Sequence, residues 1–199
     1  MARQTAWPTL VGTSGTQLGG FLRAQGRLDE ARQVLVGAMA ALQAVPSGIS
    51  RANACVELGV VLLRLDRAVE AVAPLAESIR MYRELGSLDN LALALVHQAV
   101  VLSAIGDAAG ALVVLREGEA LIEQHAMSVL HISVSQALAT IHRRHCLPAP
   151  ADASAPTPAA DYAERALEQG RHVAGWKPPA AMVAELAPDW AAAGQHERA

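Results

Sequence analysis

Histidine is the first residue type in this sequence whose spacing could support chemistry. His142 and His145 are three positions apart, which would place both imidazoles on one face of a helix, and Cys146 follows directly. Imidazole and thiolate groups are the ligands that zinc prefers. Cys146 would point away from that face, however, no acidic residue lies near, and no second cysteine follows at zinc-finger spacing. We therefore interpret this segment, with the nearby His125 and His131, as a polar helix end and expect no metal and no cofactor.

Nucleophiles and carboxylates form no catalytic pattern. Ser14 lies in the segment Gly-Thr-Ser-Gly-Thr, but a nucleophile elbow needs a preceding strand, and a phosphate-binding loop needs a terminal Gly-Lys-Ser/Thr. The glutamates follow helical spacing, and no two of them are set apart as a buried pair. We expect solvated helix faces rather than an active site, and the chain is not expected to be an enzyme. The glutamates concerned are Glu57, Glu70, Glu77, Glu84, Glu117, Glu119 and Glu123.

Arginines near predicted helix ends allow two interpretations. Arg23, Arg64 and the pair Arg143 and Arg144 could clamp a carboxylate or an acidic peptide, because guanidinium groups bind carboxylates with two parallel hydrogen bonds. The same residues could instead be solvated helix ends, since positive charge is favoured near the C-terminus of a helix. The sequence leaves both interpretations open.

The elements that would position these side chains recur along the chain. Small and apolar residues return at a fixed interval of 40 residues, which is the signature of a stacked repeat array. The matching series are Ala31, Ala71 and Ala111; Leu35, Leu75 and Leu115; Leu22, Leu62 and Leu102; and Gly19, Gly59 and Ala99.

Composition agrees with a helical array and excludes several classes of protein. The 199 residues are 52% hydrophobic but only 3% aromatic, so the core must be built from Ala, Leu and Val, which suits closely packed helices. The net charge of −3 and the absence of basic runs argue against nucleic-acid binding and against membrane insertion. Two distant cysteines and the lack of a signal peptide predict a cytoplasmic protein.

Apolar periodicity and turn residues predict an all-α fold of antiparallel helix hairpins. After a frayed lead-in at 1–8, a single array over 9–199 is expected to contain about four and a half repeats. The last is truncated, and we expect either a fragment of a longer polypeptide or a chain whose end is covered by a partner. The repeats are 9–47, 48–87, 88–127, 128–174 with a Pro-rich insert at 147–160, and 178–199. The helices are expected from Pro8 onward and then at 28–44, 49–65, 68–85, 88–105, 108–125, 128–145 and 161–173.

These repeats resemble tetratricopeptide repeats. The family's pattern is present as Leu18-Gly19, Leu22, Gly26 and Glu30-Ala31, and it returns one period later in similar form. The period of 40 residues departs from the family's usual 34 or so, which implies longer helices. The resemblance implies a right-handed superhelix with a concave groove lined by the first helix of each hairpin.

Carried over to this sequence, the resemblance implies a partner-binding groove with an apolar middle and basic ends. Flanking positions Thr13, Thr16, Leu93, Ser103 and Ser133 fall on the same helix faces. The groove residues are Arg23, Asn53, Val56, Val60, Arg64, Val96, Val100, Gln136, Thr140, Arg143 and Arg144.

A narrower resemblance concerns the C-terminal third. Segments 142–148, 162–167 and 175–179 are similar to the repeat region that precedes a GGDEF diguanylate cyclase domain in some bacterial proteins, although no GGDEF segment is present. The resemblance implies a non-catalytic module of a larger bacterial signalling protein that binds a protein or peptide and regulates an attached output domain. Two alternatives stay open: a small-molecule sensor enclosed by the groove valines, and a scaffold that forms a homodimer.

Overall fold

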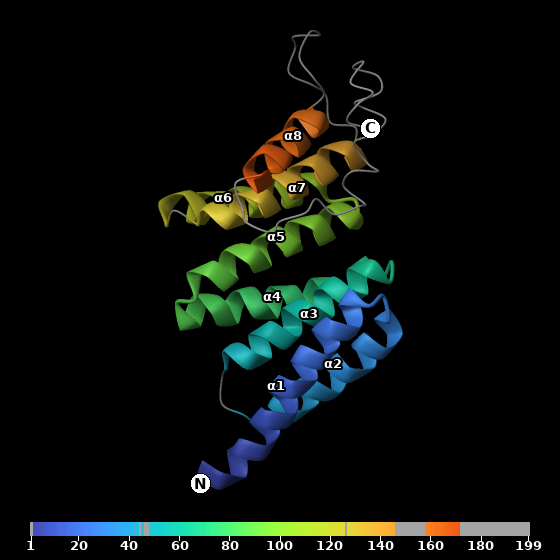
Figure 1. Cartoon of the computed structure of the whole chain (residues 1–199), viewed down its shortest axis with the longest axis vertical. Helices are drawn as coiled ribbons and strands as arrows, with labels where there is room; N and C mark the ends of the chain where they lie inside the picture. Colours follow the sequence, from blue (N-terminus) through green and yellow to red (C-terminus); the bar gives the residue numbers. More distant parts are fainter. Residues whose placement is uncertain (1, 44, 46–47, 126, 146–157, 172–199) are drawn as a thin grey trace.

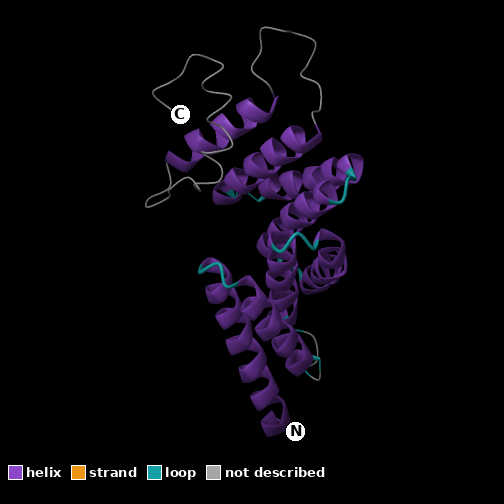
Figure 2. Ribbon diagram, turned by 90° about the vertical axis from the view of Figure 1, so that its right-hand side faces the viewer, coloured by secondary structure: helices purple, strands orange, loops and turns teal. Residues whose placement is uncertain are grey.

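The chain folds into stacked pairs of antiparallel helices (Figure 1). The computed structural model describes residues 2–43, 45, 48–125, 127–145 and 158–171, and within them every regular element is a helix, joined by short loops (Figure 2). The all-α prediction is therefore confirmed. The helices are α1 (Ala2–Ala24), α2 (Leu28–Leu42), α3 (Ile49–Arg64), α4 (Ala68–Leu85), α5 (Leu88–Ala104), α6 (Ala108–Gln124), α7 (Ser128–His145) and α8 (Pro158–Arg171).

Helix bounds between Leu28 and His145 agree with the expected ranges to within one or two residues. Two elements differ. Helix α1 begins at Ala2 and runs through Pro8, where a frayed lead-in was expected, and α8 begins at Pro158, within the expected Pro-rich insert. The remainder of that insert and the truncated repeat at 178–199 lie outside the described residues.

The 40-residue register places equivalent residues in equivalent surroundings. Ala31, Ala71 and Ala111 are each 0% exposed, and the leucines four positions later are also buried. A Cβ added to Gly59 would lie 2.6 Å from Cγ of Leu75, closer than real side chains approach. Small residues therefore mark where the two helices of a hairpin cross, as the sequence predicts.

The turns inside the first three hairpins share one geometry. The turn residue has a positive φ in each case, 78° at Gly26, 58° at Asp66 and 93° at Gly106. The amide of the next residue donates to the carbonyl oxygen five positions earlier, at 3.0, 2.9 and 3.0 Å in chain order. This is the hydrogen-bond pattern of a left-handed helix C-cap, which favours glycine because a Cβ is unfavourable there.

Asp66 is the described non-glycine residue with a positive φ, and its replacement tests the turn. We expect Asp66→Gly to raise the free energy of unfolding by about 0.5–1 kcal/mol, because glycine adopts this conformation without steric cost. The reverse exchange, Gly26→Asp, is expected to lower it by a similar amount. Urea unfolding of both variants measures the two changes, and equal signs would contradict a shared turn geometry.

The core is continuous through the stack. One cluster of buried residues joins the first two hairpins to α5, and a second joins α5, α6 and α7. Val114 and Leu121 of α6 pack against both clusters. The hairpins therefore share a single core, and the first helices α1, α3, α5 and α7 are held side by side along one face of the stack.

Candidate functional site

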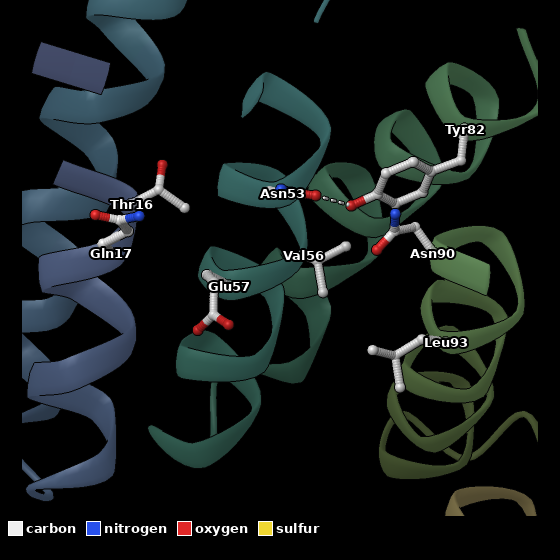
Figure 3. Close-up of a pocket in the computed structure, with 8 residues that line it drawn as sticks. All are labelled: Thr16, Gln17, Asn53, Val56, Glu57, Tyr82, Asn90 and Leu93. Atoms are coloured by element: carbon white, nitrogen blue, oxygen red, sulfur yellow. Dashed lines mark hydrogen bonds between the residues drawn. The ribbon is translucent and has the colours of Figure 1, made fainter. Parts of the chain in front are cut away.

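A pocket of about 290 Å³ opens on the face formed by the first helices (Figure 3). Helices α1, α3 and α5 each contribute to its wall, and α4 contributes one aromatic ring. Gln17 at the rim is exposed, so the pocket communicates with solvent. The lining residues are Thr16, Gln17, Asn53, Val56, Glu57, Tyr82, Asn90 and Leu93.

Three of the residues that line the pocket carry amide side chains. The hydroxyl of Tyr82 donates to Oδ1 of Asn53 at 2.6 Å, and Nδ2 of Asn90 donates to Oγ of Ser87 at 2.9 Å. Burial raises the pKa of Tyr82 to about 12, so the phenol stays protonated and keeps donating at neutral pH. The Asn53 amide retains its N–H donors, and the Asn90 amide retains its carbonyl acceptor. The wall therefore presents both donors and acceptors in fixed positions.

A salt bridge ties two hairpins together beside the pocket. Nε of Arg23 on α1 lies 2.8 Å from Oε2 of Glu57 on α3, with the two side chains 30% and 28% exposed. The expectation that Glu57 lies on a solvated face is therefore wrong, because its carboxylate faces a neighbouring helix. The positive charge of Arg23 is therefore paired with the Glu57 carboxylate within the protein. The pocket wall is close to neutral as a result.

His97 of α5 lies near the same pair of charges. Desolvation of the imidazole lowers its pKa to about 4; the Glu57 carboxylate opposes this shift and the Arg23 guanidinium reinforces it. The ring is therefore neutral at physiological pH. Gln17, Glu57 and His97 share one repeat position, so a polar stripe runs across three successive first helices.

This histidine gives the stability a predictable pH dependence. Between pH 6.5 and about 4 the unfolded chain binds a proton at His97 that the folded chain does not, so stability falls as the pH falls through this range. The slope contributed is at most about 1.4 kcal/mol per pH unit. We expect His97→Gln to flatten the curve of unfolding free energy against pH in this window. The control is Gln33→Ala at an exposed residue that does not titrate, and equal curves for both variants would contradict the assignment.

Of the four predicted groove valines, the structure places one in the pocket wall. Val56 is 9% exposed and lines the pocket, whereas Val96 is 4% exposed and belongs to the second core cluster. Val60 and Val100 are half-buried and pack against the two clusters. The wall of the described pocket is therefore built mainly from side chains other than these four valines.

Asn53 lines the pocket and Arg23 pairs with Glu57 beside it, whereas the remaining predicted groove residues lie away from the pocket. Arg64 is exposed and its Nη1 donates to the carbonyl oxygen of Arg23 at 2.9 Å, which joins the C-terminal ends of α3 and α1. On α7, Oγ1 of Thr140 donates to the carbonyl oxygen of Gln136 at 2.9 Å. Arg143 is half-buried and Arg144 exposed, both in the last turn of α7. None of the α7 residues lines the pocket.

The histidine-rich end of α7 has a structural contact. Nε2 of His145 lies 3.1 Å from both Oγ and the carbonyl oxygen of Ser103, which ties α7 to the end of α5. Across the described residues, no group of three or more His, Cys, Asp or Glu side chains converges on a metal site. Likewise, no helix in this part of the chain is long and apolar enough to cross a bilayer.

Four of the eight lining residues were predicted from the sequence, whereas Gln17, Glu57, Tyr82 and Asn90 were not. Tyr82 carried a usable signal: it occupies the same repeat position as Leu42 and Ile122, and all three are buried. A hydroxyl at a repeat position that is otherwise apolar indicates a local hydrogen-bond partner. Gln17 and Glu57 each follow a predicted groove position by one residue, and Asn90 precedes Leu93 by three, so none of them falls on a predicted position.

Comparison with known proteins identifies the architecture. Residues 12–84 match the tetratricopeptide repeat family model. A crystal structure of nearly identical TPR-like repeats from a putative kinesin light chain of Podosopora anserina is 18% identical, with a TM-score of 0.64, and the match covers 96% of this chain and 90% of that one. The crystal structure of BtubC (BKLC) from P. vanneervenii is 16% identical, with a TM-score of 0.63, and the match covers 99% and 85%. The curated proteins contain no match. The chain therefore has the all-helical, stacked-hairpin fold of tetratricopeptide-like repeat proteins.

Proposed function

We propose that this chain is a protein-interaction module that binds an extended segment of a partner protein in the pocket between α1, α3 and α5. Tetratricopeptide repeats generally serve as protein-interaction modules. The observation that carries the proposal is the ring of amide side chains, Gln17, Asn53 and Asn90, contributed by three successive first helices around one pocket. A peptide backbone offers alternating N–H and C=O groups, which amide side chains match as both donors and acceptors.

The pocket is suited to a neutral segment of peptide. Glu57 and Arg23 neutralise one another, and the remaining wall combines amides with the apolar side chains of Val56 and Leu93. An uncharged or apolar side chain of the partner would fill this space without leaving a charge unpaired. The hydrogen bond between Tyr82 and Asn53 and the salt bridge fix the wall in advance, so that little backbone has to be ordered on binding.

Single amide replacements test this proposal. A peptide selected from a displayed random library against the chain serves as the probe, and fluorescence anisotropy measures its affinity. We expect Gln17→Ala and Asn90→Ala each to weaken binding about 3- to 10-fold, as loss of one hydrogen bond does. Gln33→Ala, at an exposed glutamine on α2, is the matched control and should bind as the parent does. Equal affinities of all three variants would overturn the proposed site.

A second proposal concerns the larger protein to which this module would belong. We propose that the module belongs to a cytoplasmic bacterial signalling protein and passes partner binding to an output domain such as a GGDEF cyclase. The support is the resemblance of the C-terminal third, of which 146–148 and 175–179 lie outside the described residues. Assay of cyclase activity in the complete reading frame, with and without the selected peptide, tests it. Activity indifferent to the peptide would oppose this regulatory role while leaving the binding site standing.

A further inference from the structure

Helix α1 carries an exposed apolar stripe that the proposed pocket does not use. Its members follow helical steps of three and four residues, which place them on one face of the helix. We call this the α1 stripe; it consists of Trp7, Leu10, Val11, Leu18 and Phe21, which are 71%, 57%, 42%, 49% and 60% exposed.

The same face is buried in every later hairpin. Phe21 corresponds in the repeat register to Val61, Val101 and Ile141, each of which is 0% exposed. Helices α3, α5 and α7 are each covered by the second helix of the preceding hairpin, whereas α1 packs against α2 and α3 alone among the described elements. The α1 stripe is therefore the face that later first helices bury against a second helix, and within the described residues it is exposed.

The area of the stripe matches what a dimer requires. Large apolar side chains present about 150–250 Å² each when fully exposed, so the stripe exposes on the order of 500–600 Å². This is as large as the largest patch on a typical monomer, about 300–600 Å². Two such stripes buried completely against each other remove at most about 1,000–1,200 Å², which is the size of a weak, reversible interface and agrees with a monomer–dimer equilibrium.

The order of residues along the stripe is complementary to itself. Ser14, an exposed small residue, lies at its centre, with Trp7 and Phe21 seven positions away on either side. If two copies of α1 run antiparallel about Ser14, Trp7 faces the partner's Phe21 at both ends, and Leu10 faces the partner's Leu18 between them. Aromatic pairs of this kind contribute beyond the area they bury.

Charge does not oppose the pairing. Residues 4–22 contain no charged side chain, so two stripes approach without like-charge repulsion. The antiparallel arrangement also sets the dipoles of the two helices in opposite directions. We propose that two copies of this chain associate through their α1 stripes to form a symmetric dimer; none of the stripe residues lines the amide-lined pocket.

Sedimentation equilibrium across roughly 1 μM to 1 mM tests the dimer. We expect the parent chain to show a monomer–dimer equilibrium and Phe21→Asp to raise the dissociation constant at least about 100-fold, because the change removes an aromatic anchor at both ends of the contact. The control is Val113→Asp, at a 66% exposed valine on α6 far from α1. Phe21 and Val113 are both exposed, and thermal unfolding of each variant checks that it folds. The peptide affinity of Phe21→Asp should equal that of the parent, so failure of the dimer and failure of the pocket are separable.

Cysteine cross-linking tests the orientation. Trp7→Cys mixed with Phe21→Cys should give a mixed disulfide on mild oxidation, because a disulfide needs Cα atoms within about 7 Å. Oxidation of the parent chain measures the background of cross-linking through its native cysteines. Four outcomes would overturn the proposal: a monomer at all concentrations, a mass that grows beyond the dimer, a dimer unaffected by Phe21→Asp, or efficient cross-linking of Trp7→Cys with itself.

Discussion

Replacing Leu75 with alanine should lower the free energy of unfolding by about 2–5 kcal/mol, the range for a leucine removed from a packed core. Leu75 is 0% exposed and covers Gly59 of the facing helix, where an added Cβ would lie 2.6 Å from its Cγ. Because Gly59 has no side chain that could move into the vacated space, we expect the upper part of that range. Chemical unfolding measures the change.

The matched control lies on the same helix. Leu85 is 43% exposed near the end of α4, and Leu85→Ala should cost well under 1 kcal/mol. Similar losses for the two variants would mean that Leu75 does not occupy the contact that the structure assigns to it.

The second large effect concerns the opposite change, from small to large. Ala71→Leu should lower the free energy of unfolding by about 1–3 kcal/mol, because Ala71 is 0% exposed where α4 crosses α3, and there is no room for three further carbons. For a chain of this length that corresponds to a melting temperature lower by roughly 2–4 °C per kcal/mol.

Ala73 supplies the control for this prediction. It lies two residues further along α4 and is exposed, so Ala73→Leu should change the melting temperature little. An unchanged melting temperature for Ala71→Leu, or equal shifts for both variants, would refute the 40-residue register.

Most of the fold could be predicted because each boundary has a local signal. Gly26, Gly86 and Gly106 end helices with a positive φ, and the fixed period places the helices between them. The start of α1 could not be predicted from local propensity, since its glycines and Pro8 are poor helix formers. Packing explains the glycine at position 15: a Cβ there would lie 2.9 Å from Cβ of Ala38, so α1 needs glycine to approach α2 closely.

The candidate site could be predicted only in part, for a different physical reason. The family resemblance implies which face of a first helix lines the groove, and this led to Asn53 and Val56. It does not reveal contacts between helices far apart in the chain. Glu57 looked like a solvated residue because its partner Arg23 lies 34 positions away. Salt bridges between hairpins depend on how the hairpins stack, and the residue pattern of a single helix does not determine this.

The most direct measurement of the central claim is an NMR titration of the chain with a library-selected peptide, observed at the side-chain amides. The account predicts that the resonances of Gln17, Asn53 and Asn90 shift together on binding, while that of Gln33 on α2 stays in place. Shifts confined to α2, α4 and α6, with the pocket amides unmoved, would contradict it.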